Sequence, residues 1–130
     1  MYSVIRSGEL QPSPWGTVKF EGESYGSNEA FLNFVGDGFR HHNPFFEGSA
    51  ESLQAGMVEN AQQNPNKVLE VKRVIAEGDF VVVHSHVRQN PDELGAAVVH
   101  IFQFEKDRIV QLWDLGQPVP EKSPNQYGMF

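Results

Sequence analysis

Residues 80–117 read FVVVHSHVRQNPDELGAAVVHIFQFEKDRIVQLWDLGQ, and this stretch decides the fold. It holds three apolar segments with strand character, at 80–89, 96–105 and 108–117, separated by turn-forming residues. Side chains alternate between the two faces of a strand, so residues of one parity share a face. If the segments pair as neighbours, their even-numbered residues predict an apolar wall that carries three imidazoles and a carboxylate. These residues are Phe80, Val82, His84, His86, Val98, His100, Phe102, Phe104, Val110, Leu112 and Asp114.

The rest of the chain is expected to add helices and further strands. The patterns predict a short strand at 17–20, a helix from 28 to about 36, a helix at 49–63 capped by Ser49, and a strand at 68–76. A loop that contains Gly38, His41 and His42 is expected between the two helices. Gly78 and Asp79 predict a turn into the segment at 80–89. The fold class is therefore α+β.

Composition bounds the function. The 130 residues suit a single domain, 1–130, in which 1–27 is an atypical segment rich in Pro and Gly. The net charge of −7, with ten Lys and Arg, argues against nucleic acid as a partner. The sequence shows neither a bilayer-spanning apolar run nor a signal-peptide pattern, so we expect no membrane association and a cytoplasmic location. Cysteine is absent, which excludes disulfides and thiolate chemistry.

The odd-numbered residues of the same three segments are also apolar, and they predict a second face that something must cover. A second subunit is the simplest cover, so we expect a homodimer through this outer sheet face. The odd-numbered set is Val81, Val83, Val87, Val99, Ile101, Ile109, Trp113 and Leu115.

Several strings, in this order and spacing, resemble the SnoaL-like polyketide cyclase branch of the NTF2-like superfamily. They are HNP at 42–44, VKRVIAEGD at 71–79, VHSH at 83–86, IFQF at 101–104, IVQLWD at 109–114 and QPVP at 117–120. The resemblance implies a cone: a curved, mostly antiparallel sheet wrapped over N-terminal helices and enclosing an apolar pocket, commonly in a dimer. It also implies cofactor-free acid–base chemistry in which an acid near Asp114 shuttles protons. Members usually carry Asp where His100 stands and His where Leu112 stands, so the polar pair is rearranged here.

The candidate catalytic residues are Asp114, His100, His42 and His86. A hairpin centred between Lys106 and Asp107 would bring His100 close enough to Asp114 for a diagonal contact, and such a pair could move a proton on a small apolar carbonyl compound. His42, which the resemblance places at the pocket rim, or His86 would then bond the oxygen where charge develops. Neither a cofactor nor a metal is required. The expected lining is Phe34, Phe45, Phe46, Met57, Phe80, Val82, His84, Phe102 and Leu112.

Two alternatives stay open. One is a non-catalytic module of the same fold that binds a small molecule or a protein, which the apolar Leu112 favours. The other is a cupin-type barrel that binds metal through His84 and His86, because Gly78 and this His-x-His match the opening of that motif. The acidic residue that the motif requires next comes too late, at Asp92 or Glu93.

Overall fold

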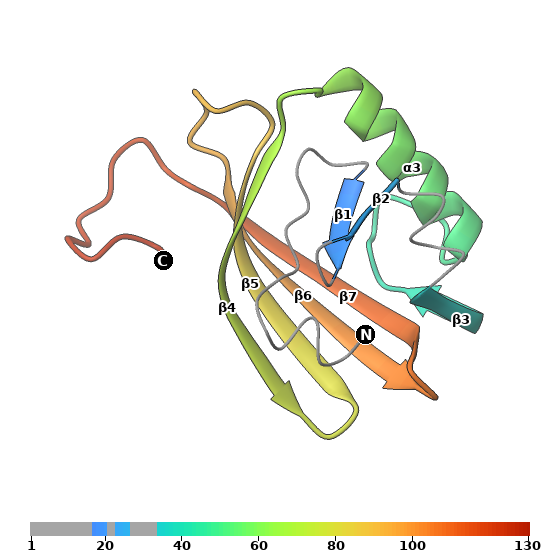
Figure 1. The fold of residues 1–130 in the computed structure, drawn as a ribbon. Coiled ribbons are helices and arrows are strands. Elements are labelled where there is room, and N and C mark those ends of the chain that lie inside the picture. Colours follow the sequence, from blue (N-terminus) through green and yellow to red (C-terminus); the bar gives the residue numbers. More distant parts are fainter. Residues whose placement is uncertain (1–16, 21–22, 27–33) are drawn as a thin grey trace.

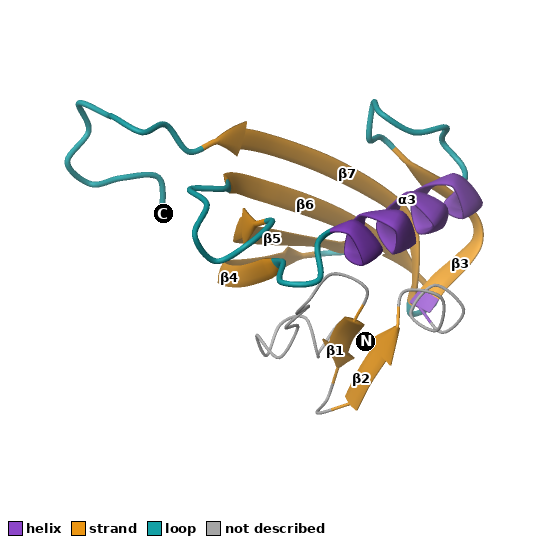
Figure 2. Ribbon diagram, turned by 90° about the horizontal axis from the view of Figure 1, so that it is seen from above, coloured by secondary structure: helices purple, strands orange, loops and turns teal. Residues whose placement is uncertain are grey.

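The computed structural model describes residues 17–20, 23–26 and 34–130, with side chains described from residue 34 onward. Within these residues, one helix lies across one side of a curved five-stranded sheet (Figures 1 and 2). The strand order is β3-β7-β6-β5-β4, with β3 parallel to β7 and the other neighbours antiparallel. The elements are β3 (Val35–His41), α3 (Ala50–Gln63), β4 (Val68–Glu77), β5 (Phe80–Arg88), β6 (Ala96–Glu105) and β7 (Arg108–Pro118). The α+β cone is thereby confirmed.

The N-terminal segment contributes a separate two-stranded sheet. β1 (Thr17–Phe20) and β2 (Glu23–Gly26) pair antiparallel, which confirms the short strand predicted at 17–20. The helix predicted from residue 28 to about 36 lies mostly outside the described residues; Phe34 is still helical and β3 begins at Val35. β3 also replaces most of the predicted loop, since pairing with β7 overrides the local helical spacing.

The helix α3 begins and ends where the sequence indicates. Ser49 is its N-cap, and the Ser49 side chain accepts a hydrogen bond from the Ser52 backbone N–H at 3.2 Å. Asn64 is the C-cap, directly before the predicted break at Pro65. Leu53 is the buried residue of the helix and packs against the inner face of the sheet. The core consists of Phe39, Leu53, Val81, Val83, Phe104 and Ile109.

Strand pairing corrects the predicted wall. Directly opposed residues of antiparallel strands share a face, and odd-numbered residues of β5 oppose even-numbered residues of β6, as in Val83 with His100. The eight residues between the paired Val87 and Ala96 produce this shift in parity. Val81, Val83 and Ser85 therefore lie on the inner face with His100, whereas the even-numbered residues of β5 face outward. The even-numbered residues in question are Phe80, Val82, His84 and His86.

A β-bulge in β7 sets the relation between β6 and β7. Lys106 and Asp107 both have positive φ and form the two-residue turn that closes the Glu105–Arg108 pair. From that turn alone, His100 would oppose residue 113, and Asp114 would lie on the other face. Val110 has no partner in β6, so one extra residue is inserted and His100 opposes Asp114 directly.

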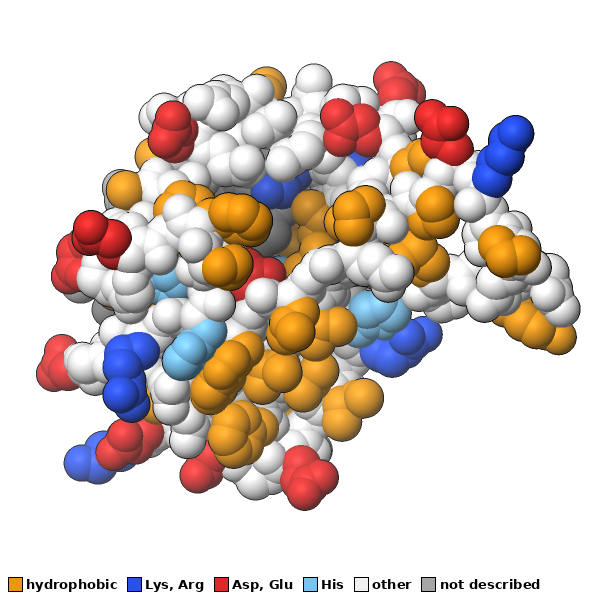
Figure 3. All heavy atoms as spheres, turned by 180° about the vertical axis from the view of Figure 1, so that it is seen from behind, with side chains coloured by type: hydrophobic (Ala, Val, Ile, Leu, Met, Phe, Trp, Pro, Cys, Tyr) orange, Lys and Arg blue, Asp and Glu red, His pale blue; other side chains and the backbone are white. Residues whose placement is uncertain are grey.

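The outer face of the sheet is apolar over its middle strands, and one side of the molecule shows a contiguous hydrophobic patch flanked by histidines (Figure 3). Of the odd-numbered residues predicted to lie there, Val99, Ile101, Trp113 and Leu115 do so. Val81, Val83, Val87 and Ile109 instead face inward, because of the register of β5 and the bulge in β7. The described residues contain no candidate for a membrane-spanning helix.

Candidate functional site

Asp114 and His100 are opposed on the inner face, near the middle of β6 and β7. His100 Nε2 lies 3.8 Å from Asp114 Oδ1, which is too long for a hydrogen bond but well within the range of electrostatic coupling. The His100 side chain is 12% exposed and that of Asp114 is 27% exposed. The carboxylate is therefore the more accessible member of the pair.

Asn43 fixes the other oxygen of the carboxylate. Its Nδ2 donates to Asp114 Oδ2 at 2.9 Å, and its Oδ1 accepts from the Phe45 backbone N–H at 2.9 Å, so the amide orientation is determined from both ends. The Asn43 backbone N–H donates to Nδ1 of the buried His41, so Nε2 of His41 carries the proton that it donates to the Glu47 carbonyl. His41 thus shapes the loop that places Asn43.

Lys67 brings a positive charge to the same region from the connection between α3 and β4. It is 8% exposed, and its Nζ donates to Asn60 Oδ1 on α3 at 2.6 Å. Its backbone N–H donates to the Asn64 carbonyl at 3.1 Å, which anchors the residue at the end of the helix. The inner polar cluster is defined here as Asn43, Asn60, Lys67, His100 and Asp114.

Burial and mutual charge tune this cluster. Burial lowers the pKa of Lys67 from 10.5 to about 8, and the nearby negative charge of Asp114 opposes that effect. Burial also lowers the pKa of His100; Asp114 raises it, and Lys67 lowers it again. At neutral pH the imidazole is therefore neutral while most of Lys67 is charged. A neutral imidazole offers one donor and one acceptor beside a carboxylate.

His42 does not join the cluster. Its ring stacks on the Trp113 indole, with centroids 4.8 Å apart and planes 3° from parallel, and its Nε2–H donates to Gln111 Oε1 at 3.1 Å. Trp113 and Gln111 oppose Ile101 and Gln103 on the outer face, so His42 lies on the side away from Asp114. The prediction that His42 lies at the rim of a pocket with Asp114 is wrong. In the HNP string, Asn43 and not His42 is directed toward the carboxylate of Asp114.

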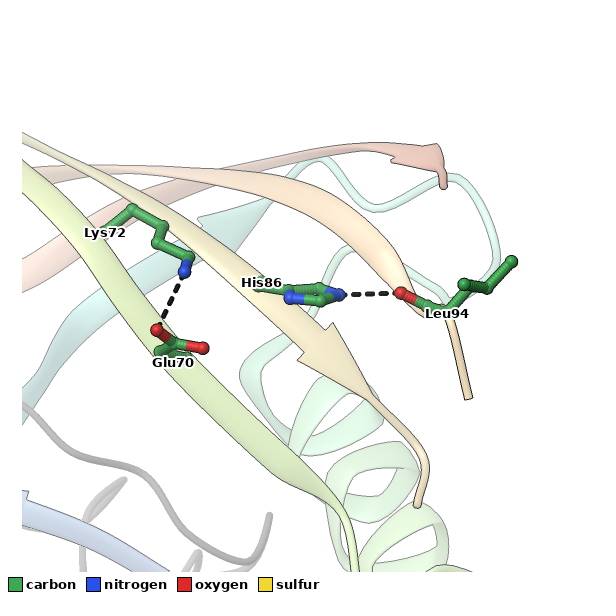
Figure 4. A network of polar contacts seen from close by, with 4 residues as sticks. All are labelled: Glu70, Lys72, His86 and Leu94. Atoms are coloured by element: carbon green, nitrogen blue, oxygen red, sulfur yellow. Dashed lines mark hydrogen bonds and ion pairs between the residues drawn. The ribbon is translucent and has the colours of Figure 1, made fainter. Parts of the chain in front are cut away.

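His84 and His86 lie on the outer face, as the β5 register requires. Arg73 donates to Nδ1 of His84, and burial followed by the charges of Arg73 and Lys72 lowers the pKa of His84. His86 points along the sheet toward the next loop, where its Nε2–H donates to the Leu94 carbonyl at 2.7 Å (Figure 4). Both rings also stack on Phe130.

These partners leave the two imidazoles unsuited to a shared metal. Among residues 34–130, no group of three or more His, Asp or Glu side chains could hold a metal ion. The cone also replaces the barrel that a cupin would need, so the cupin alternative is wrong.

The remaining predicted lining residues divide between the faces. Phe34, Met57, Phe102 and Leu112 pack against the core from the inner side. Phe80 and Val82 face outward. Phe45 is 86% exposed, so it lines no enclosed space, and Phe46 lies against Gly56 on α3 while 41% exposed.

Outside the inner polar cluster, an open groove of about 660 Å³ lies where the β5–β6 loop meets the end of β7. It brings together two carboxylates, from Glu93 and Glu121, but neither an imidazole nor a lysine. Its lining is Val87, Gln89, Glu93, Leu94, Gly95, Ala96, Pro118, Val119 and Glu121.

The sequence predicts the proximity of Asp114 and His100, which the structure brings together, but it does not indicate that Lys67, Asn60 and Asn43 join them. Asn43 lies in the HNP string, 71 positions before Asp114, and nothing local in the sequence indicates that the two side chains meet. Lys67 stands directly before β4 with Asn64, Pro65 and Asn66 ahead of it, which is typical of an exposed turn. Nothing local in the sequence indicates that the turn folds inward.

Comparison with known proteins gives a consistent family assignment. The model of the SnoaL-like domain matches residues 20–112. No curated protein matches the chain. A SnoaL-like protein of unknown function from Burkholderia thailandensis is similar in structure, with a TM-score of 0.58 and 21% identity over 68% of this chain and 80% of that one.

Two further solved structures carry functional descriptions. AclR, a candidate hydroxylase from Streptomyces galilaeus, has a TM-score of 0.59 and 20% identity over 70% of this chain and 68% of that one. A candidate polyketide cyclase from Sinorhizobium meliloti has a TM-score of 0.57 and 14% identity over 68% of this chain and 81% of that one. At these identities, the likeness establishes the shared fold alone.

Proposed function

Because the chain belongs to the SnoaL-like family, we propose that it catalyses cofactor-free proton transfer on a small apolar carbonyl compound. The observation that carries the proposal is the pairing of Asp114 with His100 on the apolar inner face, 3.8 Å apart and partly shielded from water. A carboxylate held by Asn43 on one oxygen has its other oxygen directed toward the imidazole. This arrangement suits a general base whose conjugate acid returns the proton.

In the proposed reaction, Asp114 takes a proton from the carbon next to a carbonyl group. The electron pair of the C–H bond forms a C=C bond, and the carbonyl electron pair moves onto oxygen to give an enolate. If a C=C bond is conjugated with the enolate, the proton can return from Asp114 to its far carbon, which gives isomerisation. Aldol closure follows if the enolate carbon attacks a second carbonyl in the same molecule; the π electron pair of that carbonyl moves onto its oxygen, which then takes the proton from Asp114. The neutral His100 assists by accepting or passing on the proton.

The test is exchange of carbon-bound protons in D₂O. A panel of small cyclic ketones would be followed by proton NMR, and the wild-type protein is expected to catalyse loss of the signal next to the carbonyl. Asp114→Asn removes the base and should lower the exchange rate by about 100-fold or more. The matched control is Asp107→Asn, the same change at the exposed β6–β7 turn, which should leave the rate unchanged.

A non-catalytic binding module is the second candidate, and the observation that favours it is the apolar Leu112 opposite Phe102 on the inner face. A non-catalytic binder would bind the ketones, which would shift the NMR resonances of inner-face residues. The carbon-bound protons of the ketones would then exchange no faster than they do in buffer alone. Equal exchange by the wild type and Asp114→Asn would likewise contradict the catalytic proposal.

We also propose that a second copy of the chain covers the outer face and that the dimer works in the cytoplasm. The exposed apolar residues Ile75, Phe80 and Leu115 support a homodimer, because isolated domains rarely leave such a surface open to water. Trp113, stacked under His42, lies within the same surface.

A further inference from the structure

The proposed proton transfer leaves one chemical role unfilled. Removal of a proton beside a carbonyl places negative charge on the carbonyl oxygen, and in an apolar site this charge needs a fixed donor or cation. His42 and His86, the residues expected from sequence to serve, lie on the opposite face of the sheet. A group on the inner face must therefore stabilise the oxygen.

We propose that Lys67 is this group, and that the substrates are carbonyl compounds whose oxygen becomes anionic when Asp114 takes the proton. This inference rests on the proposed function. Lys67 brings the positive charge of the inner polar cluster from the α3–β4 connection, and Asn60 holds its ammonium through a hydrogen bond of 2.6 Å. An ammonium has three N–H groups and can bind a ligand oxygen as well as Asn60.

Charge balance favours Lys67 over a neutral donor. Before reaction, the cluster contains one negative charge on Asp114 and one positive charge on Lys67, with His100 neutral. When Asp114 becomes protonated, the negative charge moves to the substrate oxygen and stays beside the same cation. The reaction therefore creates no uncompensated charge in a site where burial already weakens the hold of Lys67 on its proton.

A competing explanation is that Lys67 only ties α3 to β4 through Asn60. The two roles differ in ligand selectivity, because a structural tether has no preference between an anion and its neutral isostere. Benzoate and benzamide form such a pair: both are flat rings, and only benzoate carries an anionic oxygen. Binding of each would be measured by NMR titration of inner-face resonances.

Asp114→Asn, in which no carboxylate of the cluster offsets the charge of Lys67, is expected to bind benzoate about tenfold more tightly than benzamide at pH 7. Added to this variant, Lys67→Met should abolish that preference, Lys67→Arg should retain it, and Lys122→Met, an exposed lysine in the C-terminal segment, should leave it unchanged. In Asp114→Asn itself the preference should fall as the pH rises and the buried Lys67, beside the neutral His100, loses its proton. This last measurement needs no change at Lys67, so it stands even if Lys67→Met fails to fold.

Asp114→Asn separates this inference from the proposed function. Removing the carboxylate charge should strengthen benzoate binding while it abolishes proton exchange. If exchange is absent from the wild type but the benzoate preference depends on Lys67, the cation site stands and the catalytic proposal fails. If Asp114→Asn shows no preference for benzoate, or keeps it when Lys67→Met is added and the protein is folded, the assignment of Lys67 is refuted.

Discussion

Lys67 makes the stability of the protein depend on pH in a way that one substitution can isolate. Its pKa is about 8 in the folded protein and 10.5 in an unperturbed chain. Between these values the unfolded chain binds more protons than the folded protein, so the free energy of unfolding rises with pH. Below pH 8 both states are protonated, and the cost of burying the charge is fully present. Above pH 10.5 that cost is gone.

The size of the effect follows from the two pKa values, which differ by about 2.5 pH units. At about 1.4 kcal/mol per unit the upper bound is about 3.5 kcal/mol. Water that still reaches the lysine, which is 8% exposed, reduces the cost of burying its charge and lowers the expected value to about 2 kcal/mol. The wild type should gain this amount relative to Lys67→Met between pH 7 and pH 11.

Urea unfolding at a series of pH values, followed by Trp fluorescence, measures the difference. Titrating groups that do not interact with Lys67 cancel when the two free energies are subtracted. Lys122→Met serves as the control for loss of an exposed lysine. A difference between the wild type and Lys67→Met that stays constant from pH 7 to pH 11 would refute the view that Lys67 is buried as a cation.

Two further predictions concern the β5–β6 loop and the outer face of the sheet. Gly95→Ala should destabilise the protein by about 3 kcal/mol in urea unfolding, because Gly95 has a φ of +73° and an added Cβ would lie 2.1 Å from the Val87 carbonyl oxygen. Gly78 has a φ of +57° but open space around it, so Gly78→Ala should lower the free energy of unfolding by only about 1 kcal/mol. Equal losses of unfolding free energy in the two variants would contradict the predicted clash of the Gly95 Cβ with Val87 and leave backbone strain as the whole cost. For the outer face, Leu115→Glu should weaken dimerisation by about 2 kcal/mol or more in light-scattering measurements across concentrations; a monomeric wild type would contradict the proposed interface.

Local patterns in the sequence were sufficient for most of the elements. Ser49 and Asn64 mark the ends of α3 because caps and breakers act within a few residues. The two-residue turns at Gly78 and Lys106 were readable for the same reason. The loop predicted around Gly38 and His41 is wrong, because pairing of β3 with a strand about 70 positions away determines the backbone there.

The site was predictable only in part, because face assignment depends on register. His100 and Asp114 were identified, but the expectation that His84 and His86 join them required β5 and β6 to share parity. The length of the β5–β6 loop decides that parity. The sequence does not indicate that Val87 and Ala96 are the residues that pair at the two ends of this loop. Lys67 was missed because its inward position depends on how α3 packs on the sheet, through Asn60, and not on its own neighbours in the chain.

The unpaired Val110 has a consequence for how related sequences should be compared. Counting residues from the β6–β7 turn would match His100 with Trp113, so a relative that lacks the extra residue would present an indole to the interior and its acid to the opposite side. Gain or loss of one codon at this point is therefore enough to exchange the faces of the sheet on which the acid and the indole lie. Alignments of this strand should place their gap at position 110, where the backbone itself accommodates it.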